Sequence, residues 1–143
     1  IYTSITLDLF KEALAIHDGF GAVIQAYLYR SIDDLNPEDL FEHDQDHYGG
    51  LSAVDALAEW SRINSRDSVL DLCSGLGGPA RYLAYRYGCE VTGLDINKSR
   101  TIGALELTSW VNLDDKVFFV CGNATSMPFA KSSFSKVIRQ EAY

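Results

Sequence analysis

Two carboxylates and the glycine-rich turn between them are the residues whose types and spacing could carry chemistry. Asp71 lies at the end of a short apolar run, and residues 75–80 read Gly-Leu-Gly-Gly-Pro-Ala. Glycines let a backbone turn tightly and pass close to a ligand. Asp95 follows Gly75 by twenty residues, and at that spacing a carboxylate can accept hydrogen bonds from both hydroxyls of a ribose. The arrangement predicts a nucleotide-binding site.

The charge of Asp71 separates nucleotides that carry phosphate from those that do not. The turn matches a loose G-x-G-x-x-A dinucleotide pattern, which taken alone is a weak match. A carboxylate aimed into this turn would repel a pyrophosphate by about one or two kcal/mol after screening and would attract an ammonium group. S-adenosylmethionine has an amino group and a sulfonium but no phosphate. The sequence therefore favours S-adenosylmethionine and keeps NAD as the less favoured alternative.

The same segment resembles motif I of the class I (Rossmann-fold) S-adenosylmethionine-dependent methyltransferases, an acidic residue followed by G-x-G-x-G. The matching residues are Asp71, Cys73, Gly75 and Gly77, so Cys73 replaces the first glycine. Residues 44–51 read Asp-Gln-Asp-His-Tyr-Gly-Gly-Leu. Together with motif I and the later Gln-Glu-Ala, they are similar to the glycine, sarcosine and dimethylglycine N-methyltransferases and their small-molecule relatives.

The resemblance assigns roles to individual residues. It implies that Asp71 anchors the methionine end of the cofactor, that the motif I glycines cradle it and that Asp95 holds the ribose. Asn123 would meet the adenine amino group, and the Ala124 N–H would serve adenine N1. Gln140 would begin the loop that faces the methyl acceptor, and Gln45, His47 and Tyr48 would belong to a loop that closes over the cofactor. Two alternatives stay open from the residues alone: Asp71 as a strand-end cap, and Asn123 as part of an ordinary turn.

Composition excludes several classes of function. The chain has 143 residues, a formal charge of -8 and a pI near 4.7, which disfavours nucleic-acid and anionic-membrane partners because both require clustered basic residues. Its three cysteines form no C-x-x-C pair, and the pair His43 and His47 lies in a loop, so no metal site is expected. No long apolar run or signal peptide is present, and a cytoplasmic location is expected. Arg81 is interpreted as a solvated helix residue.

The periodicity predicts an α/β domain preceded by helices. Residues 1–48 are expected to form a helical extension and cap loop, and residues 49–143 an S-adenosylmethionine-binding domain. Pro37, Leu51, Pro79 and Ser99 mark the expected helix starts; the last helix would point Ile102, Leu105 and Ser109 inward. Strands are expected at 69–72, 90–95, 116–121 and 135–140, the third buried on both faces. Alternating strands and helices predict a doubly wound parallel sheet in the order 3-2-1-4.

Compared with a full methyltransferase of this fold, residues 1–143 would supply only the cofactor-binding half. The fourth strand is then an edge that invites pairing, and a homodimer or larger homo-oligomer covering this edge is expected. The predicted reaction is transfer of a methyl group to a small molecule, with an amine as the favoured acceptor. The alternative is a truncated module that binds the cofactor without turnover. No catalytic residue is assigned.

Overall fold

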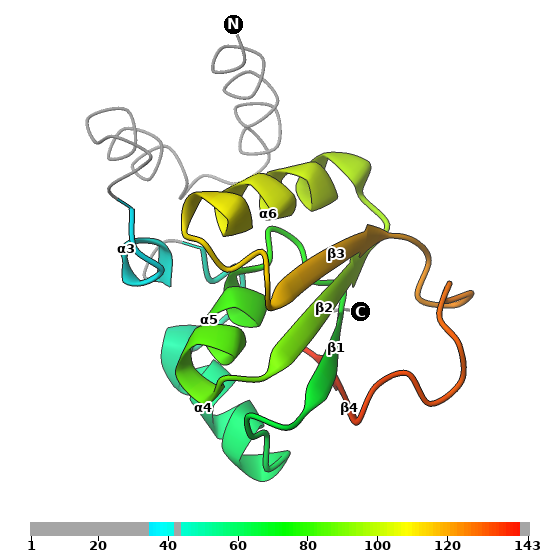
Figure 1. The fold of residues 1–143 in the computed structure, drawn as a ribbon, viewed down its shortest axis with the longest axis horizontal. Coiled ribbons are helices and arrows are strands. Elements are labelled where there is room, and N and C mark those ends of the chain that lie inside the picture. The colour runs from blue at the N-terminus through cyan, green and yellow to red at the C-terminus, as the bar shows by residue number, and fades with distance from the viewer. Residues whose placement is uncertain (1–34, 42–43, 141–143) are drawn as a thin grey trace, which may run out of the picture.

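The computed structural model describes residues 35–41 and 44–140 (Figure 1). Of the helical extension and cap loop expected in residues 1–48, residues 1–34, 42 and 43 lie outside these ranges, as does Glu141. The elements are α3 (Glu38–Phe41), α4 (Gly50–Trp60), β1 (Ser68–Leu72), α5 (Gly78–Tyr87), β2 (Glu90–Asp95), α6 (Lys98–Trp110), β3 (Val117–Cys121) and β4 (Lys136–Arg139).

The four strands form one parallel sheet in the order β3-β2-β1-β4, which confirms the predicted topology. Val69 pairs with Val91, which in turn pairs with Val117, so one row of valines crosses three strands. All three are buried. Parallel strands joined by helical crossovers bring their carboxyl ends to one edge of the sheet. Asp71 and Asp95 therefore lie near the same edge.

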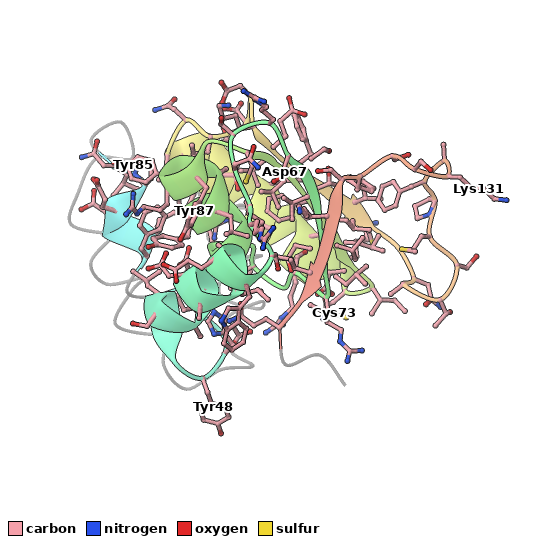
Figure 2. The ribbon with its side chains drawn as sticks, turned by 90° about the horizontal axis from the view of Figure 1, so that it is seen from below. Tyr48, Asp67, Cys73, Tyr85, Tyr87 and Lys131 are labelled. Atoms are coloured by element: carbon pink, nitrogen blue, oxygen red, sulfur yellow. The ribbon has the colours of Figure 1, made fainter. Side chains whose placement is uncertain are left out.

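The helices of the described part lie on one side of the sheet, and residues 122–135 loop out on the other (Figures 1 and 2). Helix α5 packs on β2, α6 packs on β2 and β3, and α4 packs on α5. Ala80, Leu83 and Ala84 of α5 are buried in the core. Burial of this apolar stripe is the main stabilising contribution to such a layer.

The turn between β1 and α5 depends on glycine for packing as well as for conformation. Gly77 has a φ of 79° and precedes the helix, and Pro79 lies in the first helical turn. A Cβ atom added at Gly77 would lie 2.2 Å from Cζ of Phe119 on β3. A larger residue would collide with the ring, so Gly77 lets α5 begin close to the sheet.

Helix α6 corrects two predictions. Its N-cap is Asn97, whose side chain accepts a hydrogen bond from the N–H of Arg100, and not Ser99. Its buried residues are Thr101, Gly103, Ala104, Leu107 and Thr108, whereas Leu105 is 46% exposed. Small and hydroxyl residues face inward because the helix approaches closely. A Cβ at Gly103 would lie 3.0 Å from the side chain of Leu76 in the glycine turn.

Strand β3 is less buried than its apolar sequence predicts. Phe118 is 44% exposed and Cys121 is exposed, so the expectation of burial on both faces is wrong. The strand lies at one end of the sheet, and within residues 35–41 and 44–140 it pairs only with β2. An end strand lacks the second neighbour that would cover it.

Candidate cofactor-binding site

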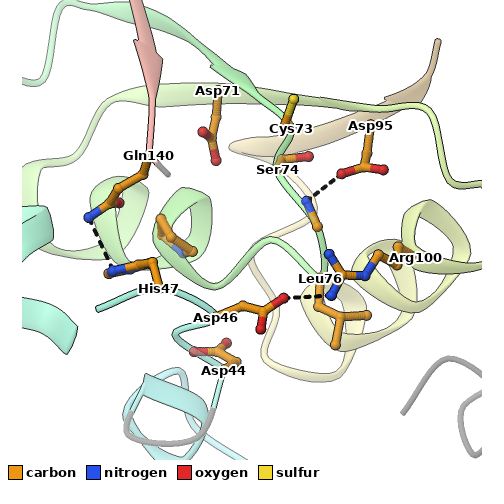
Figure 3. Close-up of a pocket in the computed structure, with 12 residues that line it drawn as sticks. Asp44, Asp46, His47, Asp71, Cys73, Ser74, Leu76, Asp95, Arg100 and Gln140 are labelled. Carbon is orange, nitrogen blue, oxygen red and sulfur yellow. Dashed lines mark hydrogen bonds and ion pairs between the residues drawn. The ribbon is translucent and has the colours of Figure 1, made fainter. Parts of the chain in front are cut away.

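An open cavity of about 220 Å³ lies at the carboxyl edge of the sheet (Figure 3). The ends of β1 and β2 line it, together with the segments that follow β1, β2 and β4 and the loop of residues 44–48 that precedes α4. The lining residues are Asp44, Asp46, His47, Asp71, Cys73, Ser74, Gly75, Leu76, Pro79, Asp95, Arg100 and Gln140. Four are aspartates, of which Asp44 and Asp46 form ion pairs with Arg81 and Arg100. Among the described residues, Asp71 and Asp95 form no such ion pair with a basic side chain, so that end of the cavity suits a ligand that carries positive charge.

Asp71 is the most perturbed acid of the cavity. It is 3% exposed, and its Oδ2 has no hydrogen-bond partner in the described part of the chain. Burial, followed by the nearby negative charge of Asp95, raises the pKa of the Asp71 carboxyl to about 7. A buried acceptor without a partner is costly. An ammonium group in the cavity would supply a hydrogen-bond donor and a compensating charge, so the residues fit the methionine end of S-adenosylmethionine.

The backbone after β1 is held in an unusual conformation that opens it to the cavity. Cys73 and Gly75 have φ values of 59° and 56°. Residues other than glycine rarely adopt this left-handed backbone conformation. The N–H of Cys73 donates to the carbonyl of Leu94 at 2.8 Å. A Cβ at Gly75 would lie 3.1 Å from Nη1 of Arg100. A side chain at position 75 would therefore crowd the cavity.

Asp95 at the end of β2 already organises the turns beside it. Its Oδ2 accepts the N–H of Gly75 at 2.8 Å, and its Oδ1 accepts the N–H of Asn97 at 2.8 Å. A carboxylate oxygen has two acceptor sites, so each oxygen retains one for a ligand hydroxyl. Asp95 is half-buried and lines the cavity. This geometry is compatible with the predicted contact to a ribose.

Two ion pairs tether the 44–48 loop to the helices. Nη2 of Arg81 lies 2.8 Å from Oδ2 of Asp44, and both side chains are almost completely buried. The interpretation of Arg81 as solvated is thus wrong. Its Nη1 also donates to the carbonyl of Ala104 at 3.3 Å and to Oγ1 of Thr108 at 3.1 Å. The sequence does not reveal this partnership because Asp44 lies 37 residues away in the chain.

The second tether crosses the glycine turn. Nη2 of Arg100 lies 2.6 Å from Oδ2 of Asp46, and both side chains are partly exposed. Figure 3 shows this pair on the side of the cavity opposite Asp71. Exposed pairs of this kind contribute roughly 0–1 kcal/mol, so the contact can open without a large loss of stability.

His47 and Gln140 form the remaining wall of the cavity. Nε2 of Gln140 lies 3.2 Å from Nδ1 of His47, and Nε2 of His47 lies 3.1 Å from Oε1 of Gln45. Oε1 of Gln140 is buried without a partner among the described residues. Tyr48 points outward and is 87% exposed. Within the predicted closing loop, His47 therefore faces the cavity and Tyr48 does not.

Five of the predicted site residues meet at this cavity, and three do not. Asp71, Cys73, Gly75, Asp95 and Gln140 line it. Gly77 packs against Phe119 instead. Asn123 and Ala124 are exposed in the loop after β3, and Oδ1 of Asn123 accepts the backbone N–H and the hydroxyl of Thr125, at 2.9 and 2.8 Å. Contact of Asn123 and Ala124 with adenine stays a prediction.

Sequence reasoning missed several lining residues. These are Asp44, Asp46, Ser74, Leu76, Pro79 and Arg100. Ser74, Leu76 and Pro79 lie within or next to motif I and could have been named from it. Asp44, Asp46 and Arg100 were harder to identify as lining residues, because a sequence does not show which opposite charges on separate elements form pairs.

Two further observations concern the described residues only. In residues 35–41 and 44–140, no cluster of three or more histidine, cysteine or acidic side chains could hold a metal ion. None of the helices in these ranges has the length and hydrophobicity needed to cross a bilayer.

Residues 69–142 match a family described as "Methyltransferase domain". The chain belongs to this methyltransferase family. The match begins in β1 and includes every strand of the sheet. Together with the similar proteins and structures described next, it confirms the predicted class I, S-adenosylmethionine-dependent family. The predicted boundary between residues 48 and 49 stays untested.

Curated relatives cover the same part of the chain. A sterol 24-C-methyltransferase of Eremothecium gossypii is 38% identical over 86 residues, which are 60% of this chain and 23% of the relative. A glycine/sarcosine/dimethylglycine N-methyltransferase of Actinopolyspora halophila is 32% identical over 90 residues, which are 63% of this chain and 16% of the relative. The matched region thus spans about a fifth of the length of these relatives.

The fold is also found in solved methyltransferase structures. A phosphoethanolamine N-methyltransferase of Haemonchus contortus, bound to phosphomonomethylethanolamine and S-adenosylhomocysteine, is similar with a TM-score of 0.62 and 27% identity. The similarity covers 71% of this chain and 24% of that one. The chain therefore has the cofactor-binding architecture of S-adenosylmethionine-dependent methyltransferases.

Proposed function

We propose that the chain binds S-adenosylmethionine in the cavity beside Asp71 and transfers its methyl group to an amine nitrogen of a small molecule. The observation that carries the proposal is the unpartnered Oδ2 of Asp71, buried at the carboxyl edge of the sheet within a methyltransferase family match. An ammonium is the ligand group that both pairs with this oxygen and lowers the pKa of its carboxyl.

The cofactor would lie along the edge of the sheet from Asp71 to Asp95. Asp71 would hold the amino group, the open backbone at Gly75 would lie against the cofactor, and Asp95 would accept the ribose hydroxyls. Asn123 and Ala124 would approach the adenine from the loop after β3. When bound, S-adenosylmethionine supplies an electrophilic methyl group on its sulfonium.

The acceptor would enter from the side of His47 and Gln140. The buried Oε1 of Gln140 is an acceptor that an amine N–H can satisfy. The tethered 44–48 loop would exclude water and hold the acceptor in line with the methyl group, and such alignment lowers the barrier to a bimolecular transfer. Support for an amine comes from two similar N-methyltransferases. Seven other similar proteins are named as C-methyltransferases of sterols, so a carbon acceptor is the alternative to be tested.

Two experiments test the proposal in order. Calorimetry should detect binding of S-adenosylhomocysteine and none of NAD; the reverse result would refute the cofactor assignment. A radiolabelled methyl assay with glycine, sarcosine and other amines then tests transfer. Cofactor binding without labelled product would favour a binding module that does not turn over, and labelling of a carbon acceptor would refute the amine.

We also propose that β4 mediates self-association in the cytoplasm. Within the described residues β4 pairs only with β1, and its Val137 is 59% exposed. An edge strand with free backbone groups favours pairing with another chain. This assembly is compatible with a small-molecule acceptor, because the cavity lies at the carboxyl edge of the sheet and not at its side.

A further inference from the structure

The three cysteines of the chain occupy very different environments. Cys89 is fully buried, and burial raises the pKa of its thiol to about 11, so it is unreactive. Cys121 is exposed at the end of β3 and does not line the cavity. Cys73 is exposed and does line it. Only Cys73 therefore places an accessible thiol where the cofactor is proposed to bind.

Hydrogen bonding to β2 fixes the backbone of Cys73. The residue lies directly after β1 with a φ of 59°, and its N–H is bonded to the carbonyl of Leu94 on β2. Motif I usually has glycine at this position, where a hydrogen atom stands in place of a side chain. Figure 3 shows the Cys73 side chain at the top of the cavity, between Asp71 and Asp95.

The surroundings of Cys73 point independently to a ligand. Oδ2 of Asp71 and Oγ of Ser74 are buried without partners in the described residues, and their side chains are 3% and 7% exposed. Both residues line the same cavity as Cys73. Oγ of Ser74 lies against β2, 2.5 Å from where a Cβ at Gly93 would be. Buried polar atoms are normally hydrogen-bonded, so the orphaned Oδ2 of Asp71 marks a place in this cavity where a polar ligand completes the site.

We propose that the Cys73 thiol is a covalent modification site for small soft electrophiles, and that modification of Cys73 and binding of S-adenosylmethionine exclude each other. This inference rests on the proposed cofactor site. With iodoacetamide as the probe, the thiolate sulfur attacks the methylene carbon and a C–S bond forms. The C–I bond breaks, iodide leaves and the thiol proton passes to solvent. The added acetamide group then occupies part of a cavity of about 220 Å³.

Alkylation of the unmodified chain, followed by mass spectrometry of each cysteine-containing peptide, tests the first half of the inference. S-adenosylhomocysteine binding is first measured by calorimetry on the untreated protein. At about 100 times the dissociation constant roughly 1% of the protein is free, so alkylation of Cys73 should fall roughly 100-fold. Cys121 serves as an internal control, and its alkylation should change little. Equal protection of both cysteines, or protection of neither, would overturn the inference.

The second half is tested in the opposite direction. Iodoacetamide treatment should abolish S-adenosylhomocysteine binding to the unmodified chain and to Cys121→Ala. In Cys73→Gly the affinity before and after treatment should be equal, whatever its starting value. Loss of binding in treated Cys73→Gly would overturn the inference and leave the proposed function standing. An untreated chain that does not bind S-adenosylhomocysteine would overturn both.

Discussion

Replacement of Asp71 by asparagine tests the electrostatics of the cavity most directly. The pKa of the Asp71 carboxyl rises from its ordinary 3.8 to about 7 in the folded chain, first because of burial and then because of the charge of Asp95. At 1.36 kcal/mol per pH unit, this difference corresponds to about 4 kcal/mol of stability. The raised pKa means that the folded state binds the proton more tightly than the unfolded state.

This tighter binding of the proton decides how the stability of the fold changes with pH. The contribution of Asp71 to stability is fully present below about pH 4 and is lost as the pH rises through about 7. Asp71→Asn cannot ionise, so it should match the unmodified chain at pH 4 and exceed its stability by up to about 4 kcal/mol at pH 8. Because the other carboxylates are common to both proteins, the difference between the two unfolding free energies reports Asp71 together with its interaction with Asp95.

Chemical unfolding across pH 4 to 8 measures the effect, with Asp114→Asn as the matched control. Asp114 is exposed after α6 and does not line the cavity, so its replacement removes the same charge without the same burial. A stability difference for Asp71→Asn that does not change with pH would refute the reasoning. If the Asp114→Asn control also became more stable than the unmodified chain at pH 8, the change in net charge would explain the effect instead of the burial of Asp71.

Ligand binding to the same variant gives an independent measure. A hydrogen bond to a charged group contributes about 1.5–3 kcal/mol, so Asp71→Asn should bind S-adenosylhomocysteine roughly ten- to hundredfold more weakly. Near pH 7 the Asp71 carboxyl is about half protonated, so binding to the unmodified chain should release about half a proton per site, because the ammonium lowers the pKa of Asp71. Calorimetry in two buffers of different ionisation enthalpy detects this proton, and the variant should release none from this site.

Three further changes probe the fold and the assembly. Gly77→Ala should cost about 1–3 kcal/mol, because its Cβ would lie 2.2 Å from a ring atom at a φ of 79°. Gly50→Ala has a positive φ but no atom within 4 Å, so it separates backbone strain from collision in the same thermal unfolding assay. Arg81→Met should cost about 3–5 kcal/mol by leaving Asp44 buried and unpaired, and adding Asp44→Asn should recover most of that loss in denaturant titrations. Val137→Lys should shift sedimentation toward the monomer if β4 pairs between chains, and an unchanged sedimentation coefficient would contradict the edge-pairing proposal.

Local patterns were sufficient to predict the sheet and its central turn. The strands are short apolar runs, and the glycines and Pro79 have steric roles that depend on near neighbours. Asp71 and Asp95 could be placed together because parallel strands end at a common edge. These inferences need only residues that lie close in sequence and a fixed topology.

The loop and α6 could not be predicted in the same way. The partner of Arg81 is 37 residues distant, and nothing local distinguishes a buried arginine from a solvated one. In α6 an apolar periodicity suggested Leu105 as an inward residue, yet close approach to the glycine turn selects the small residue Gly103 instead. Packing distance overrides hydrophobicity at such contacts.

The contact between Arg81 and Asp44 also constrains how related sequences can diverge. Loss of either member alone leaves an isolated charge in the interior, so the two positions are expected to change together among homologues that share this loop. A lineage that replaced both with uncharged residues would free the segment before α4 from α5. The entrance to the cavity could then be rebuilt for a different acceptor while the sheet beneath it stays the same.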